Sequence, residues 1–186
     1  MRTSRCAIAL LLSVFMTYAA VSGNAYVENQ ETETMTVSAA LNAVEPENAY
    51  ANCGVGSTNP ENAFKTEVDR PWICVPKPHR LETVVWINLP KNITSLRAVG
   101  IAPGWDAAPG TGVRYLIPTS VTWVIGDTHY QQKDLVAGQL NTLNIPKTPA
   151  HRQAMLIIGE VSPLEPAYDP STTALAVQKL ALFAAD

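Results

Sequence analysis

The chain has 186 residues, of which 47% are hydrophobic and 16% charged, and its 13 basic and 16 acidic side chains give a formal net charge of -3. This hydrophobic fraction is typical of a folded protein and excludes wholesale disorder. The charge shows neither a basic excess nor basic blocks, so we expect no nucleic-acid partner.

The N-terminal residues predict a signal peptide over residues 1–25. Arg2 and Arg5 precede the apolar stretch Cys6–Val21, and small residues follow at Gly23–Ala25. A basic start, an apolar core and a small-residue cleavage site are the parts of a secretory signal. The core is short for a membrane span, which takes about 20 residues. We therefore expect a secreted, extracellular protein without stable membrane insertion, and an uncleaved anchor is the alternative.

Residues 26–50 differ in composition from the rest of the chain. They contain five glutamates, no basic residue and few bulky apolar side chains. This composition predicts an acidic, solvated and largely disordered linker, with order near its end, where Val37–Val44 could form a strand or short helix. A single folded domain is expected over residues 51–186.

Cys53 and Cys74 are the cysteines that remain once the signal peptide is removed. An even pair in an exported protein predicts a disulfide. Two free thiols or part of a metal site are the alternatives. Because the three histidines are scattered along the chain, we expect no metal and no cofactor.

From residue 51 onward, short apolar runs alternate with turns rich in proline and glycine. In one run Val85, Ile87 and Leu89 would face the core and Trp86 would face away, whereas Trp123 belongs to the core-facing set of its own run. This period-two alternation predicts half-buried antiparallel strands. The expected strands are Thr83–Leu89, Ser95–Ile101, Ser120–Ile125, Gln139–Ile145, Gln153–Val161 and Ala174–Phe183. No sustained helical pattern separates them, so the fold class is all-β, a sandwich or jelly roll.

A series of short motifs follows in a fixed order along this domain. They are Asn59–Phe64, Pro71–Cys74, Trp86–Pro90, Ile93–Asp106, Thr122–Trp123, Gln139–Pro146, Arg152–Val161 and Thr172–Leu180. Their order over residues 50–184 resembles a discoidin-like, galactose-binding-like domain, the fold of factor V/VIII type C domains. More narrowly, it resembles the glycan-binding domain associated with bacterial NAD glycohydrolases. The resemblance implies an antiparallel jelly-roll sandwich.

The chain departs from this family at two places. Lys65–Thr66 stand where the family carries Asp-Gly, in a loop that helps to hold calcium in many such domains. Val177–Gln178 stand where a glutamate is common near the start of the last strand. Glu67 and Asp69 offer other oxygen ligands, but the lysine argues against a metal ion, and none is predicted.

The turn-rich stretch Gly100–Ile117 contains the candidate ligand-binding residues. Sugar sites combine an aromatic face with a few planar polar groups. Trp105 could stack on a pyranose ring, while Asp106 and Arg114 accept and donate hydrogen bonds. Tyr115 completes the predicted set. The alternative is a flap whose Trp105 and Tyr115 only plug the end of the sandwich.

The sequence lacks the common catalytic motifs. It contains no Gly-x-Ser-x-Gly elbow, no His-Glu-x-x-His and no phosphate-binding glycine loop. We therefore predict no enzyme but a secreted, non-catalytic binding module that recognises carbohydrate at a cell surface or in the extracellular medium. The main alternative is a secreted structural or interaction protein that docks a protein partner through the same sandwich, and a small secreted hydrolase is a third.

Overall fold

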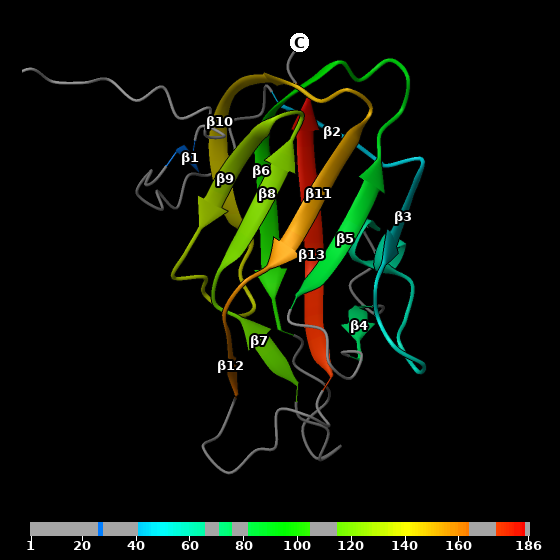
Figure 1. Ribbon diagram of the computed structural model, residues 1–186, viewed down its shortest axis with the longest axis vertical. Helices are drawn as coiled ribbons and strands as arrows, with labels where there is room; N and C mark the ends of the chain where they lie inside the picture. The colour runs from blue at the N-terminus through cyan, green and yellow to red at the C-terminus, as the bar shows by residue number, and fades with distance from the viewer. Residues whose placement is uncertain are drawn as a thin grey trace, which may run out of the picture.

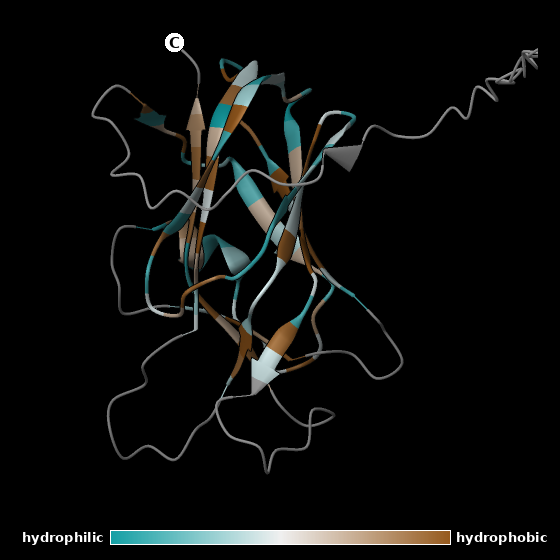
Figure 2. Cartoon of the chain, turned by 90° about the vertical axis from the view of Figure 1, so that its left-hand side faces the viewer, coloured by the Kyte–Doolittle hydropathy of each residue, from teal (hydrophilic) through white to brown (hydrophobic). Residues whose placement is uncertain are grey.

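The computed structural model describes residues 26–27, 41–65, 71–75, 82–104, 115–163 and 174–184. Within these ranges the chain forms β-strands and one short 3-10 helix, η1 (Pro60–Phe64). Two sheets lie face to face, as Figure 1 shows from the front and Figure 2 shows edge-on. No helix in the described ranges is long and apolar enough to cross a membrane.

The first sheet contains six strands in the described part of the chain. Its two-residue edge strand β1 pairs in parallel with β9, and all the other neighbours are antiparallel. In spatial order the strands are β1 (Tyr26–Val27), β9 (Thr128–Gln132), β8 (Val121–Ile125), β11 (Gln153–Ile158), β5 (Thr83–Asn88) and β3 (Asn48–Ala51).

The second sheet is organised around β13 (Leu175–Ala184), the longest described strand. One side of β13 pairs with β6, and its other side pairs with β4 at the start and β2 at the end. The remaining strands extend the sheet through β6 or through the first residue of β13. The bounds are β2 (Asn42–Ala43), β4 (Trp72–Cys74), β6 (Ser95–Pro103), β7 (Leu116–Pro118), β10 (Asn141–Pro149) and β12 (Val161–Pro163).

The expected fold class is confirmed, and so is the alternation on which it rested. Val85 and Ile87 of β5 and Trp123 of β8 are fully buried between the sheets, whereas Trp86 lies half-buried on the outer face. Each expected strand has an observed counterpart. The run expected over Gln153–Val161 is divided into β11 and β12, because the chain passes from the first sheet to the second at residues 159–160.

The sandwich also includes residues that the composition assigned to the linker. Residues 42–50 form β2 and most of β3, and they bury Val44 and Ala49 in the core. Residues 1–25 lie outside the described ranges, so the signal peptide stays a prediction.

The predicted disulfide between Cys53 and Cys74 is present, with the Cα atoms 5.3 Å apart. Cys53 follows β3 of the six-stranded sheet, and Cys74 ends β4 of the other sheet. The bond therefore joins the two layers of the sandwich.

Candidate functional site

The two ends of the predicted binding loop are fixed in the second sheet. Residues 105–114 connect β6 to β7, and both strands contact the start of β13. The Gly104 amide at the end of β6 donates to the Ala176 carbonyl at 2.9 Å, and Leu116 at the start of β7 pairs with Leu175. Trp105, Asp106 and Arg114 themselves lie outside the described residues.

Other connections leave the sandwich from this same end. Cys74, the last residue of β4, pairs with Leu175, and Pro163, the last residue of β12, pairs with Leu116. The segments after β4 and after β12 therefore begin beside the ends of the predicted loop. In Figure 1 this end lies at the bottom, next to β7 and β12. Such a gathering of connections at one end of a rigid sandwich is a usual setting for binding residues.

Tyr115, the remaining predicted ligand-binding residue, lies just before β7 and is only 9% exposed. Burial disfavours the charged phenolate and raises the pKa of its phenol. So little exposed ring leaves almost no aromatic face for a sugar. Its position agrees with the alternative in which Tyr115 packs at the base of the loop.

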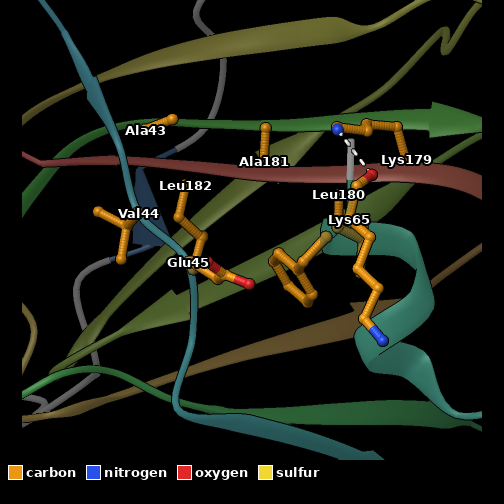
Figure 3. Close-up of a pocket in the computed structure, with 9 residues that line it drawn as sticks. Ala43, Val44, Glu45, Lys65, Lys179, Leu180, Ala181 and Leu182 are labelled. Atoms are coloured by element: carbon orange, nitrogen blue, oxygen red, sulfur yellow. Dashed lines mark hydrogen bonds between the residues drawn. The ribbon is translucent and has the colours of Figure 1, made fainter. Parts of the chain in front are cut away.

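The calcium site implied by the fold family can be tested at η1. The Lys65 carbonyl, at the end of η1, accepts a hydrogen bond from Lys179 Nζ at 2.9 Å (Figure 3). An ammonium group thus occupies a cation's place against this oxygen. In the described ranges no three His, Cys, Asp or Glu side chains gather as a metal site. The described residues do not fit a calcium ion here, while Glu67 and Asp69 lie outside them.

A hollow of about 510 Å³ lies beside this contact, between η1, the segment after β2 and strand β13. Its size is within the range of small-molecule sites, about 300–1,000 Å³. Glu45 stands across it from Lys65 and Lys179, so acidic and basic groups share its rim (Figure 3). The Lys179 ammonium already bonds to the Lys65 carbonyl rather than pointing into the hollow. We therefore do not assign a ligand to this hollow.

An exposed aromatic pair on the six-stranded sheet was not predicted. Tyr50 of β3 stacks on Trp86 of β5, with ring centroids 5.2 Å apart and ring planes 13° from parallel. Alternation along β5 already placed Trp86 on the outer face. Tyr50 lay in the expected linker, and its pairing with β5 joins residues far apart in sequence, so alternation within one strand could not reveal the pair.

Comparison with known proteins gives matches in fold alone. No protein-family model matches the chain, and no curated protein matches its sequence. Among solved structures, the CBM32-1, CBM32-2 and M60 catalytic domains of Clostridium perfringens ZmpB match with a TM-score of 0.53 and 12% identity, over 76% of this chain and 14% of that chain.

Two further matches are single modules from the same organism. The family 32 carbohydrate-binding module of NanJ, solved with galactose, has a TM-score of 0.52 and 11% identity, over 77% of this chain and 98% of that chain. CpGH89CBM32-5, solved with GalNAc-β-1,3-galactose, has a TM-score of 0.50 and 17% identity, over 77% and 100%. At these identities the likeness establishes the fold: this chain is a galactose-binding-like jelly-roll sandwich, and carbohydrate-binding modules share that fold.

Proposed function

We propose that this chain is a secreted, non-catalytic carbohydrate-binding module that recognises glycans at a cell surface or in the extracellular medium. The observation that carries the proposal is the extent of the fold match. The described sandwich corresponds to 98% of a module solved with galactose and to 100% of one solved with GalNAc-β-1,3-galactose. This extent supports the proposal that the chain acts as a binding module.

The proposed glycan site is the loop end of the second sheet. Trp105 supplies the aromatic face, and Asp106 and Arg114 bond to sugar hydroxyls. Gly104 and Leu116 support this proposal, because their backbone bonds to Ala176 and Ala174 fix both ends of the loop. The narrower resemblance, to the glycan-binding domain associated with NAD glycohydrolases, belongs to the same proposal.

Secretion is part of the proposal and is supported by the disulfide. Disulfides form and persist in oxidising compartments and are rare in the cytosol. The Cys53–Cys74 bond therefore agrees with the signal peptide predicted over residues 1–25.

A glycan array tests the proposal. The protein from Tyr26 onward is applied to galactose-, GalNAc- and fucose-terminated glycans, beside a Trp105→Ala variant with an unchanged melting temperature. Loss of a stacked aromatic face costs about 1 kcal/mol or more, so we expect at least about fivefold weaker binding. Trp105→Phe keeps an aromatic ring and should retain most of the affinity.

Two outcomes would contradict the proposal. An array without signal for the wild type would overturn carbohydrate binding and favour docking of a protein partner. Equal binding by the wild type and Trp105→Ala would leave carbohydrate binding standing but would overturn the placement of the site in this loop.

A further inference from the structure

The outer face of the six-stranded sheet carries a row of mostly apolar side chains that crosses the strands. The register pairs Tyr50 with Trp86, Trp86 with Met155, Met155 with Val124, and Val124 with His129. We call these five residues the apolar row. Figure 1 shows this face toward the viewer, and no described element crosses in front of it. Exposure decreases along the row, from Tyr50 at 51% through the half-buried Trp86 and Met155 to Val124 at 7%.

The aromatic end of the row, at Tyr50, is its most exposed part. Tyr50 is 51% exposed on the edge strand β3, and its ring stacks on the half-buried Trp86. Met155 is half-buried beside Trp86 on the next strand. Aromatic rings and a thioether present C–H and π surfaces that suit the apolar face of a pyranose.

A second row, made of amides, runs beside the apolar row. Asn88 Nδ2 donates to Asn48 Oδ1 at 2.7 Å, and Gln153 Nε2 donates to Asn88 Oδ1 at 3.3 Å. We call these three residues the amide row. Each primary amide has two donor hydrogens and an acceptor oxygen, more than these two bonds use. The amide row can therefore also bond to the hydroxyls of a bound molecule.

Both rows lead into a hollow of about 390 Å³ between two turns. The turns join β8 to β9 and β10 to β11. The hollow shares Val124 and Met155 with the apolar row and Gln153 with the amide row. Its lining residues are Val124, Gly126, Asp127, Ala150, His151, Gln153, Ala154 and Met155. An apolar floor with a carboxylate, an imidazole and an amide at its rim has the composition of a small polar ligand's site.

The two turns are packed so closely that one of them requires glycine. Gly126 has φ +57°, and a Cβ atom there would lie 2.7 Å from the Pro149 carbonyl oxygen and 3.2 Å from His151 Cδ2. His151 and Arg152 adopt left-handed backbone conformations, with φ +41° and +66°. This close packing fixes the shape of the hollow.

We infer that the hollow and the two rows form a second saccharide-binding site, separate from the loop end and resting on the proposed carbohydrate-binding function. One pyranose unit occupies the hollow, where Asp127 accepts hydrogen bonds from hydroxyls and Gln153 donates them. The chain of sugars continues over Met155 toward Trp86 and Tyr50. Neighbouring strands are about 4.8 Å apart, so Val124 to Tyr50 spans roughly 14 Å, enough for a short oligosaccharide.

The charge of the face favours a neutral ligand. The apolar and amide rows contain no Asp, Glu, Lys or Arg, the hollow adds the Asp127 carboxylate, and at the margin Arg152 pairs with Glu47 at 3.4 Å. A stable protein partner usually covers about 800 Å² on each side. The amide row borders the apolar row on one side, and the half-buried Val84 and Ile157 border it on the other. Hydrogen-bonding amides directly beside stacked aromatic rings suit a hydroxyl-rich chain.

The two proposed sites lie at opposite ends of the sandwich. In Figure 1 the β8–β9 turn beside the hollow is at the top, and β7 and β12 below the predicted loop are at the bottom. Variants can therefore test the sites separately.

Affinity electrophoresis in gels containing galactan, hydroxyethyl cellulose or glycol chitin tests the inference. We expect retardation of the wild type by at least one polymer, an affinity about five- to tenfold lower for Tyr50→Ala, and a smaller loss for Gln153→Ala. Val136→Ala removes a side chain that is 49% exposed and outside both rows, so it is the matched control and should behave as wild type.

A measurement on the wild type avoids dependence on any variant's folding. Trp86 is half-buried on the proposed site, whereas Trp72 and Trp123 are fully buried. The retarding polymer should slow oxidation of Trp86 by N-bromosuccinimide, as measured by peptide mass spectrometry. Trp72 and Trp123 serve as internal references for intact folding.

The outcomes separate this inference from the proposed function. Retardation that Trp105→Ala loses but Tyr50→Ala and Gln153→Ala keep, with Trp86 unprotected, overturns the second site and leaves the proposed function standing. Retardation that Tyr50→Ala loses and Trp105→Ala keeps supports the second site. No retardation by any polymer overturns the second site, and the array decides the proposed function. A dimer in sedimentation velocity that Tyr50→Ala abolishes also overturns the second site, because a second copy of the chain then covers this face.

Discussion

Asn141, at the start of β10, bonds through its side chain to two other backbone segments. Its buried side-chain amide donates to the carbonyls of Ile101, Val136 and Gln139 at 3.2, 2.9 and 2.8 Å, and its Oδ1 accepts the Val136 amide at 2.9 Å. One side chain thus fixes the segment between β9 and β10 against β6. Apolar residues cannot supply these bonds, and the backbone groups would be left unsatisfied.

Replacing Asn141 by leucine should therefore destabilise the fold strongly. We expect the free energy of unfolding to fall by about 2–4 kcal/mol, because several partly buried backbone groups lose their partner. Urea denaturation followed by tryptophan fluorescence measures the change. Gln139 contacts Asn141 only through its backbone carbonyl, and its side chain is exposed. Gln139→Ala should therefore lower the free energy of unfolding by less than about 0.5 kcal/mol. An equal decrease in the free energy of unfolding of both variants would show that the Asn141 side-chain bonds do not contribute to stability.

At the scale of elements, the disulfide closes a loop with a sequence separation of 21 residues between β3 and β4. The loop-entropy argument gives about 3 kcal/mol for a loop of this length. We expect a reducing agent to lower the free energy of unfolding of the wild type by about this amount in urea. The double variant Cys53→Ala, Cys74→Ala should have the lower stability already and should not respond to the reductant. A reduced wild type, verified by mass, with unchanged stability would contradict this prediction.

Strands with clear alternation could be predicted from sequence, and short strands could not. β5 alternates between buried and outward residues, so its position and the outward direction of Trp86 follow from the sequence alone. β4 and β7 have three residues each, too few to show a period. Their positions follow from their pairing with β13. The Tyr50–Trp86 pair depends on pairing between distant strands, which single-strand patterns do not contain.

The same distinction applies to the candidate sites. The sequence placed binding residues in the loop around Trp105 because aromatic and polar residues are close together there along the chain. The hollow beside Gln153 combines two turns and two strands that are distant in sequence, so no local motif marks it. Only the strand register brings its apolar and polar residues together.

At the scale of the whole molecule, covalent and apolar contacts connect the two described sheets. The disulfide joins the two sheets, and the core includes fully buried side chains from both, such as Trp123 and Leu180. At the end of η1, where unpaired carbonyls favour positive charge, Lys179 supplies its ammonium to Lys65. A lysine on β13 thus places a positive charge from within the chain against the Lys65 carbonyl.

This arrangement predicts that chelation leaves the stability unchanged. An ion whose free concentration is 1,000 times its Kd stabilises a native protein by about 4 kcal/mol. For a domain of this size, that raises the melting temperature by more than about 5 °C. We expect the melting temperature of the wild type to be the same, within error, in EDTA and in excess calcium, as measured by calorimetry. A drop in EDTA that calcium reverses would contradict the prediction. It would place a calcium site among residues such as Glu67 and Asp69, and Lys179→Met would then test whether the ammonium and the ion compete for the Lys65 carbonyl.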